Sequence, residues 1–111
     1  MGWFTNKALF GGIKNRDYET VQLALSKGAD PNSYHYGITP LMRACMADDS
    51  VIIRMLIDAG ADPHKKDKSG SYDTYEFCRD NGWEGAIKHI ENLASMRDMY
   101  KEAGIDPSNL R

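Results

Sequence analysis

Apolar residues recur at helical spacing in two similar stretches of this chain, residues 18–25 and 51–57. Within each stretch two apolar residues stand four positions apart, which places them on the same face of an α-helix. These pairs are Val21 with Leu25 and Ile53 with Ile57. The pattern therefore predicts two amphipathic helices that pack their apolar faces into a core.

The turns that follow these two helices are also alike. Residues 26–32 (SKGADPN) return as residues 58–64 (DAGADPH), 32 positions later. Self-similarity at a spacing of this size is the mark of a repeat architecture, in which each unit stacks on the next.

Signals for helix ends fall between and within the two copies. Thr39 has the side chain of an N-cap, and Pro40 then falls at the first helical position, where its missing N–H costs nothing. Ser50 is placed to cap the next helix, and Gly60 to end it in the left-handed conformation. The predicted unit is a turn, a short helix, a second turn and a longer helix.

This unit resembles the ankyrin repeat. Residues 39–44 (TPLMRA) stand where that family has Thr-Pro-Leu-His-x-Ala, with Met42 in place of the His, and residues 60–62 match its helix-ending Gly-Ala-Asp. The resemblance implies an all-α solenoid of about three helix-turn-helix repeats. The repeats are expected at about residues 5–36, 37–69 and 70–93.

Residues 83–103 carry a helical pattern longer than a repeat helix needs. We expect either one extended capping helix or two helices with a small break near Asn92, followed by a stop at Gly104-Ile105-Asp106-Pro107. Residues 1–111 are expected to form a single domain with a C-terminal cap at 94–111, because terminal repeats are atypical.

Charge and composition argue against several classes of protein. The formal net charge is −2, without the basic excess of a nucleic-acid binder. No apolar run approaches the roughly 18 residues that cross a bilayer, and the N-terminus does not follow the pattern of a secretory signal. The basic run at 65–68 is typical of a solvated loop. We expect a cytoplasmic protein that binds neither nucleic acid nor a membrane.

The two cysteines, Cys45 and Cys78, have no nearby ligand partners of the kind that metal sites need. They fall at nearly equivalent positions one repeat apart, and stacked helices lie about 8–10 Å from one another. A disulfide needs Cα atoms within about 7 Å, so we predict two free thiols in small core positions.

Other residues that suggest chemistry have simpler explanations. Gly11-Gly12 lacks the rest of a phosphate-binding loop, and small residues there allow paired helices to approach closely. Asp48-Asp49 precedes a helix N-terminus, where acidic residues are favourable. We therefore expect no cofactor, no metal and no enzymatic activity.

The resemblance also implies where a partner would bind. Ankyrin solenoids use loop tips and the exposed side of the first helix of each repeat, which line a concave groove. The corresponding positions here are Trp3 and Phe4 before the first repeat, Lys14 and Asn15 in it, His35, Tyr36, Ile38 and Met46 in the second, and Tyr72 and Asp80 in the third. Large aromatic and apolar residues, common in this set, are typical of interface cores. Alternatively, Trp3 and Phe4 cap the open end of the first repeat.

We predict a protein-binding module that acts as an adaptor or an inhibitor of one specific protein. Small stand-alone ankyrin proteins occur in bacteria, phages and viruses, and there the resemblance implies antagonism of a target or protection against one. The alternative is a structural subunit in which another chain buries Met96, Met99, Tyr100 and Ile105 of the C-terminal helix. We expect a monomer. Self-association is the other option, because three repeats are near the minimum for independent folding and association would add stability. The identity of the partner does not follow from the sequence.

Overall fold

The computed structural model describes residues 2–106. Within them the chain forms six α-helices, and its extended pairing is limited to an isolated antiparallel bridge between His35 and Ile38. The helices are α1 (Gly2–Asn15), α2 (Tyr18–Ser26), α3 (Pro40–Met46), α4 (Ser50–Asp58), α5 (Thr74–Asp80) and α6 (Glu84–Glu102).

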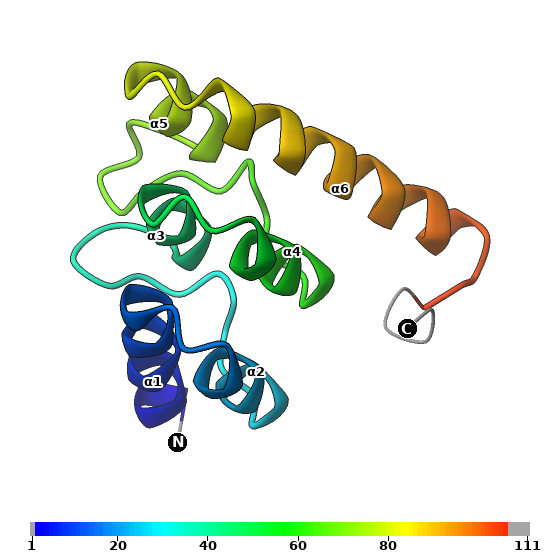
Figure 1. Cartoon of the computed structure of the whole chain (residues 1–111). Helices are drawn as coiled ribbons and strands as arrows, with labels where there is room; N and C mark the ends of the chain where they lie inside the picture. The colour runs from blue at the N-terminus through cyan, green and yellow to red at the C-terminus, as the bar shows by residue number, and fades with distance from the viewer. Residues whose placement is uncertain (1, 107–111) are drawn as a thin grey trace.

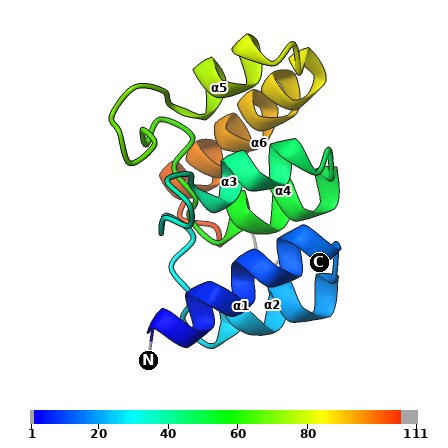
Figure 2. The ribbon, with the colours of Figure 1, turned by 90° about the vertical axis from the view of Figure 1, so that its left-hand side faces the viewer.

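The helices form three layers, and in each layer two helices are joined by a short turn (Figure 1). α1 packs on α2, α3 on α4 and α5 on α6, and α3 also contacts α1 and α5 in the layers on either side. The long loops between layers project on the side of α1, α3 and α5 (Figures 1 and 2). The predicted all-α helix-turn-helix solenoid is confirmed.

Side-chain caps start most of the helices. The Thr39 hydroxyl accepts from the Met42 N–H at the start of α3, with Pro40 at the first helical position, as predicted. The prediction for α4 was wrong by one residue, because Asp49 is the N-cap and Ser50 is already helical. The Asp49 carboxylate accepts two N–H groups, whereas a serine hydroxyl placed one residue later lies inside the helix.

Polar contacts join the first two layers at the turns between paired helices. The Tyr18 hydroxyl donates to the Asp49 carboxylate at 2.9 Å, and Arg16 Nη2 donates to the carbonyl oxygen of Ala47 at 2.6 Å. Arg16 itself has φ of 53°, and Asp48 at the matching turn has φ of 51°. The same left-handed turn is therefore built twice without glycine.

The core runs through all three layers. Its largest fully buried apolar side chains are Leu9, Ile13, Val21, Leu41, Met42, Ile52, Leu56, Ile57 and Ile90. Gly12 allows α1 to approach α2, because a Cβ on it would lie 3.0 Å from Val21 Cγ2. Close helix approach at the Gly11-Gly12 pair is thus confirmed for Gly12.

α6 is a single helix of 19 residues, without a break at Asn92, so the first of the two alternatives for this segment holds. Its Arg97 reaches back to α4, where Nη1 donates to the carbonyl oxygens of Ile57 at 3.1 Å and Ala61 at 2.8 Å. These carbonyls lie at the end of α4 and in the turn after it. The Ile57 carbonyl also accepts from the Gly60 N–H at 3.0 Å, so Arg97 adds to the backbone capping of α4.

Trp3 and Phe4 belong to the first turns of α1, so this helix begins before residue 5, where the first repeat is expected to start. No glycine with positive φ or proline interrupts residues 2–15, so the helix extends to Gly2. The centroids of the Trp3 and Phe4 rings lie 4.7 Å apart, and both side chains are mostly exposed. None of the helices in the range 2–106 is long and apolar enough to cross a membrane.

Candidate functional site

The loop between the first and second layers ends in a tight hairpin, residues 35–38. His35 and Ile38 exchange two backbone hydrogen bonds, at 3.0 and 3.3 Å. The two central residues have positive φ, 52° at Tyr36 and 82° at Gly37, which is the requirement of the commonest two-residue hairpin turn. Tyr36 lacks the conformational freedom of glycine, yet it holds this backbone with 94% of its surface exposed.

The ring of His35 joins this hairpin to α1. It lies between Phe10, at a centroid distance of 4.8 Å, and Tyr36, at 4.4 Å. The side chain of Phe10, on α1, is buried, so the exposed ring of Tyr36 packs against a His35 ring that Phe10 supports.

Two adjoining hollows open between α1 and the hairpin, and the first also reaches α3. The first, which we call the Gly11 hollow, has a volume of about 380 Å³. The second has a volume of about 350 Å³. The Gly11 hollow is lined by Lys7, Phe10, Gly11, Lys14, His35, Tyr36 and Arg43, and the second by Trp3, Asn6, Lys7, Phe10, Tyr34, His35 and Tyr36.

The lining of both hollows is basic and aromatic, with no carboxylate. Lys7, Lys14 and Arg43 supply three positive charges, and the Lys7 ammonium lies 5.4 Å from the ring centre of Trp3. The whole chain has a formal charge of −2, so this charge is a local feature of one surface.

The loop between the second and third layers ends in a longer tip, residues 67–72. The Asp67 carboxylate accepts hydrogen bonds from the N–H groups of Ser71 and Tyr72 and from the Ser69 hydroxyl. The N–H of Tyr72, together with these serine contacts, lowers the pKa of Asp67 from its ordinary value. Tyr72 is therefore held near the surface by one carboxylate.

The two loops are also joined to each other. The Lys68 N–H donates to the Gly37 carbonyl oxygen at 2.9 Å, and the Tyr34 hydroxyl donates to the Lys66 carbonyl oxygen at 2.8 Å. The Lys65 ammonium lies 4.8 Å from the Tyr34 ring centre. Tyr34 therefore packs loop against loop, whereas Tyr36 is left free of such contacts.

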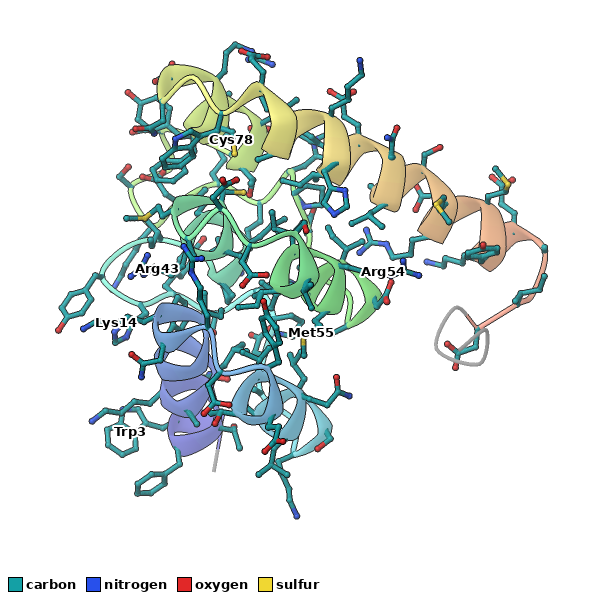
Figure 3. All side chains as sticks on the ribbon, in the orientation of Figure 1. Trp3, Lys14, Arg43, Arg54, Met55 and Cys78 are labelled. Carbon is teal, nitrogen blue, oxygen red and sulfur yellow. The ribbon has the colours of Figure 1, made fainter. Side chains whose placement is uncertain are left out.

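The structure brings together four of the ten predicted site residues, Trp3, Lys14, His35 and Tyr36, around the two hollows. Figure 3 shows Trp3, Lys14 and Arg43 on the side of α1 and α3, away from Arg54 and Met55 of α4. The other six line neither hollow, although all are at least partly exposed. They are Phe4, Asn15, Ile38, Met46, Tyr72 and Asp80.

Sequence reasoning missed Lys7, Phe10, Gly11 and Arg43 as site residues. Lys7, Gly11 and Lys14 follow one another at helical spacing, and this signal was available from the sequence. The role of Gly11 was harder to foresee, because a glycine beside Gly12 suggested only close helix packing.

A second surface lies between α2 and α4, where sequence reasoning placed no site. It contains a hollow of about 610 Å³, lined by Tyr18, Glu19, Gln22, Leu23, Ser26, Val51 and Met55. Leu23 and Val51 are about half exposed, which makes this surface more apolar than the two basic hollows. Glu19 is the one charged side chain in its lining, and the others are neutral.

Cys45 and Cys78 are free and buried, as predicted for thiols in small core positions (Cys78 is labelled in Figure 3). A hydrogen bond between the two thiols, together with burial, raises the pKa of Cys45. Cys45 is thus a thiol at neutral pH, the form that is neither a nucleophile nor a metal ligand. Among residues 2–106, no three His, Cys, Asp or Glu side chains are grouped to hold a metal ion.

The stacked helix pairs, their Gly-Ala-Asp turns and the projecting loops define a repeat protein of the ankyrin class. A family model described as "Ankyrin repeats (3 copies)" matches residues 5–71. The chain belongs to the ankyrin-repeat family, whose repeats are generally protein–protein interaction modules, and its fold is one that is typically non-enzymatic.

Curated relatives match comparable or longer stretches of the chain. The chain is 37% identical to the 2-5A-dependent ribonuclease of Mus musculus over 68 residues, 60% of this chain and 9% of that protein. It is 33% identical to the mitochondrial disaggregase of Homo sapiens over 92 residues, 77% of this chain and 13% of that protein. The chain thus spans a small part of the length of these relatives.

Proposed function

We propose that this chain binds one specific protein, as an adaptor or an inhibitor, through the surface that carries its loop tips. We call this surface the tip face and define it by Trp3, Lys14, His35, Tyr36, Met46 and Tyr72. The observation that carries the proposal is Tyr36, a large aromatic side chain held fully outward by a hairpin whose backbone it fits poorly. Strained residues of this kind gather at binding sites, because the surrounding structure keeps them there for a purpose other than stability.

The other side chains of the tip face support the same role. Trp3 is 66% exposed, and Met46 and Tyr72 are 46% and 43% exposed. Aromatic residues and methionine are enriched at interface cores, and a few such residues supply most of the binding energy. Hydrogen bonds between the two loops fix the backbones of the loop tips before a partner arrives, which reduces the entropy lost on binding.

The activities in the names of the relatives are not part of this proposal. The matched segments make up 9% of the ribonuclease and 13% of the disaggregase, so those names describe proteins of which this region is a small part. We propose a cytoplasmic, monomeric binding unit without catalysis of its own.

The test is affinity capture with the intact chain as bait, read by mass spectrometry. A second bait carries Tyr36→Ala, Met46→Ala and Tyr72→Ala, and a control bait carries Leu23→Ala and Val51→Ala. The control residues are similarly apolar and exposed but lie on α2 and α4. We expect one protein to be lost from the tip-face variant and kept by the control. Equal recovery on all three baits would show that the tip face is not the interface.

The second candidate function is a structural subunit that uses α6 and the residues after it. Met96, Met99 and Ile105 are 41%, 61% and 43% exposed, so this helix carries apolar surface away from the tip face. In that case Met96→Glu with Met99→Glu should abolish assembly while the tip-face triple alanine leaves it intact. Light scattering after gel filtration measures the mass of the assembly. A monomer that is unchanged by either variant rules out self-assembly through α6.

A further inference from the structure

The Gly11 hollow exists because one helical position lacks a side chain. A Cβ built on Gly11 meets no atom within 4 Å, whereas a Cβ on the next residue, Gly12, would press on Val21. Packing thus explains Gly12 but not Gly11, since glycine within a helix is less stable than alanine. The absent side chain leaves open space above α1, and Lys14 and Arg43 stand beside it.

The cations around this space have no acidic partner among the residues that the structure describes. Lys7, Lys14 and Arg43 form no ion pair with a carboxylate of residues 2–106, where the ion pairs involve Arg54, His64 and Lys66. Among the remaining lining residues, Phe10, His35 and Tyr36 supply aromatic surface. The hollow therefore offers three cations and an apolar wall to whatever enters it.

We propose that the Gly11 hollow receives an acidic segment of the partner protein, with a large apolar side chain against His35 and Tyr36 and carboxylates near Lys7, Lys14 and Arg43. The inference rests on the proposed protein-binding function and names the chemistry of the segment bound. A volume of about 380 Å³ lies within the roughly 300–1,000 Å³ of sites that enclose small ligands, so it accommodates one large side chain and its neighbours.

A peptide fits this surface better than a phosphate group does. Phosphate sites commonly use free backbone N–H groups at a helix N-terminus or in a glycine-rich loop. The Gly11 hollow lies along the side of α1, which runs from Gly2 to Asn15, so the N–H groups there are bonded within the helix. Three separated cations on flexible or extended side chains suit carboxylates spread along a chain.

The hollow can be filled without disturbing the fold. Gly11→Leu places a side chain in open space and improves helix propensity. Gly85→Leu is the control, because Gly85 is a helical glycine in the first turn of α6 whose Cβ, like that of Gly11, would meet nothing within 4 Å. Circular dichroism and thermal melting should show both variants folded.

The probe is a phage-displayed library of random dodecapeptides, selected on the intact chain. We expect enriched peptides to carry two or more Asp or Glu residues beside an aromatic or leucine residue. Their affinity should fall at least about tenfold in Gly11→Leu and stay unchanged in Gly85→Leu. The double variant Lys14→Glu with Arg43→Glu should weaken the same peptides, and added salt should weaken binding to the intact chain.

Several outcomes would overturn the proposal. Enriched peptides without acidic residues, or no enrichment over the Gly11→Leu bait, would show that the hollow does not bind acidic peptides.

If inorganic tripolyphosphate binds the intact chain more tightly than the best peptide, and Gly11→Leu abolishes this binding, the hollow is a phosphate site. Peptides that need Tyr36, Met46 and Tyr72 but still bind Gly11→Leu would support the tip face as the interface and contradict only the proposal for the Gly11 hollow. Peptides whose binding is unchanged by every one of these variants would contradict both proposals.

Discussion

The two loop tips hold tyrosines at the same surface by opposite means. The 35–38 hairpin has two central residues, and one of them, Tyr36, adopts a left-handed backbone that a tyrosine disfavours. The 67–72 tip is longer, and the Asp67 carboxylate gathers three hydrogen bonds that shape it. Tyr36 is 94% exposed, whereas Tyr72 is 43% exposed.

The difference teaches how much each tip depends on its own side chains. In the longer tip a polar side chain provides the order, so the aromatic residue is supported by its neighbours. In the hairpin the turn is set by backbone hydrogen bonds, and the central tyrosine adds backbone strain, although its ring contacts His35. A residue that costs stability and is displayed to solvent is best explained by what it contacts outside the chain.

The largest effect on stability is expected where the hairpin depends on glycine. Gly37 has φ of 82°, and a Cβ there meets no neighbouring atom, so Gly37→Ala acts through backbone strain alone. We expect a loss of about 1–2 kcal/mol in the free energy of unfolding, measured by urea denaturation. Gly11→Ala, in open helix, should instead gain about 0.5–1 kcal/mol. Equal effects from the two variants would show that the turn is not strained by a side chain.

A smaller and opposite change is expected at the neighbouring position. Tyr36→Asn places a residue that tolerates the left-handed conformation in the same turn, and we expect a gain of about 0.5–1 kcal/mol in unfolding free energy. The same variant should weaken binding of the captured partner, because the exposed ring is gone. Tyr72→Asn is the comparison, and it should produce no such gain. A hairpin destabilised by Tyr36→Asn would mean that the ring holds the turn.

The smallest effect separates the tips by pH. Hydrogen bonds lower the pKa of Asp67 from the ordinary 3.8, so its stabilising contribution is complete above that value. It is lost as pH falls through the lower pKa of the folded state. Hydrogen exchange should therefore show the amides of Ser71 and Tyr72 losing protection below about pH 4, while those of His35 and Ile38 change less. In Asp67→Asn, whose side chain does not ionise, the protection of the Ser71 and Tyr72 amides should no longer depend on pH in this range.

Much of the fold could be predicted from the sequence, because the repeat signals are local. The Thr39 cap, the proline after it and the left-handed Gly60 are each decided within a few residues, and all three agree with the structure. The start of α4 was misplaced by one residue because Asp49 and Ser50 are both good caps, and only the backbone decides between them. The length of α6 was left open, since sequence alone does not show that Arg97 ties it to α4.

The site was harder to predict, because its main feature is space. The large exposed residues at the tips stand out in the sequence, and Tyr36 was placed correctly at the surface. The Gly11 hollow depends on which of two adjacent glycines faces α2, and on Arg43 approaching from the next layer. Spacing within α1 gives no information on which residues of α3 lie near it, so the sequence did not indicate that Arg43 lines the hollow.

Arg97 has a consequence for anyone who wishes to lengthen this protein by design. Its guanidinium satisfies the carbonyls of Ile57 and Ala61, so the last helix is fitted to the layer directly beneath it. A unit inserted between the second and third layers would move this arginine away and remove its hydrogen bonds to both carbonyls, of which only that of Ile57 would keep a backbone partner, the Gly60 N–H. Between the first and second layers Asn32 bonds both Gly60 and Asp62, and Tyr18 and Arg16 bond Asp49 and Ala47. All three side chains come from the first unit and can be copied with each added unit. Modular extension therefore has a preferred splice point, after the first unit rather than before the last.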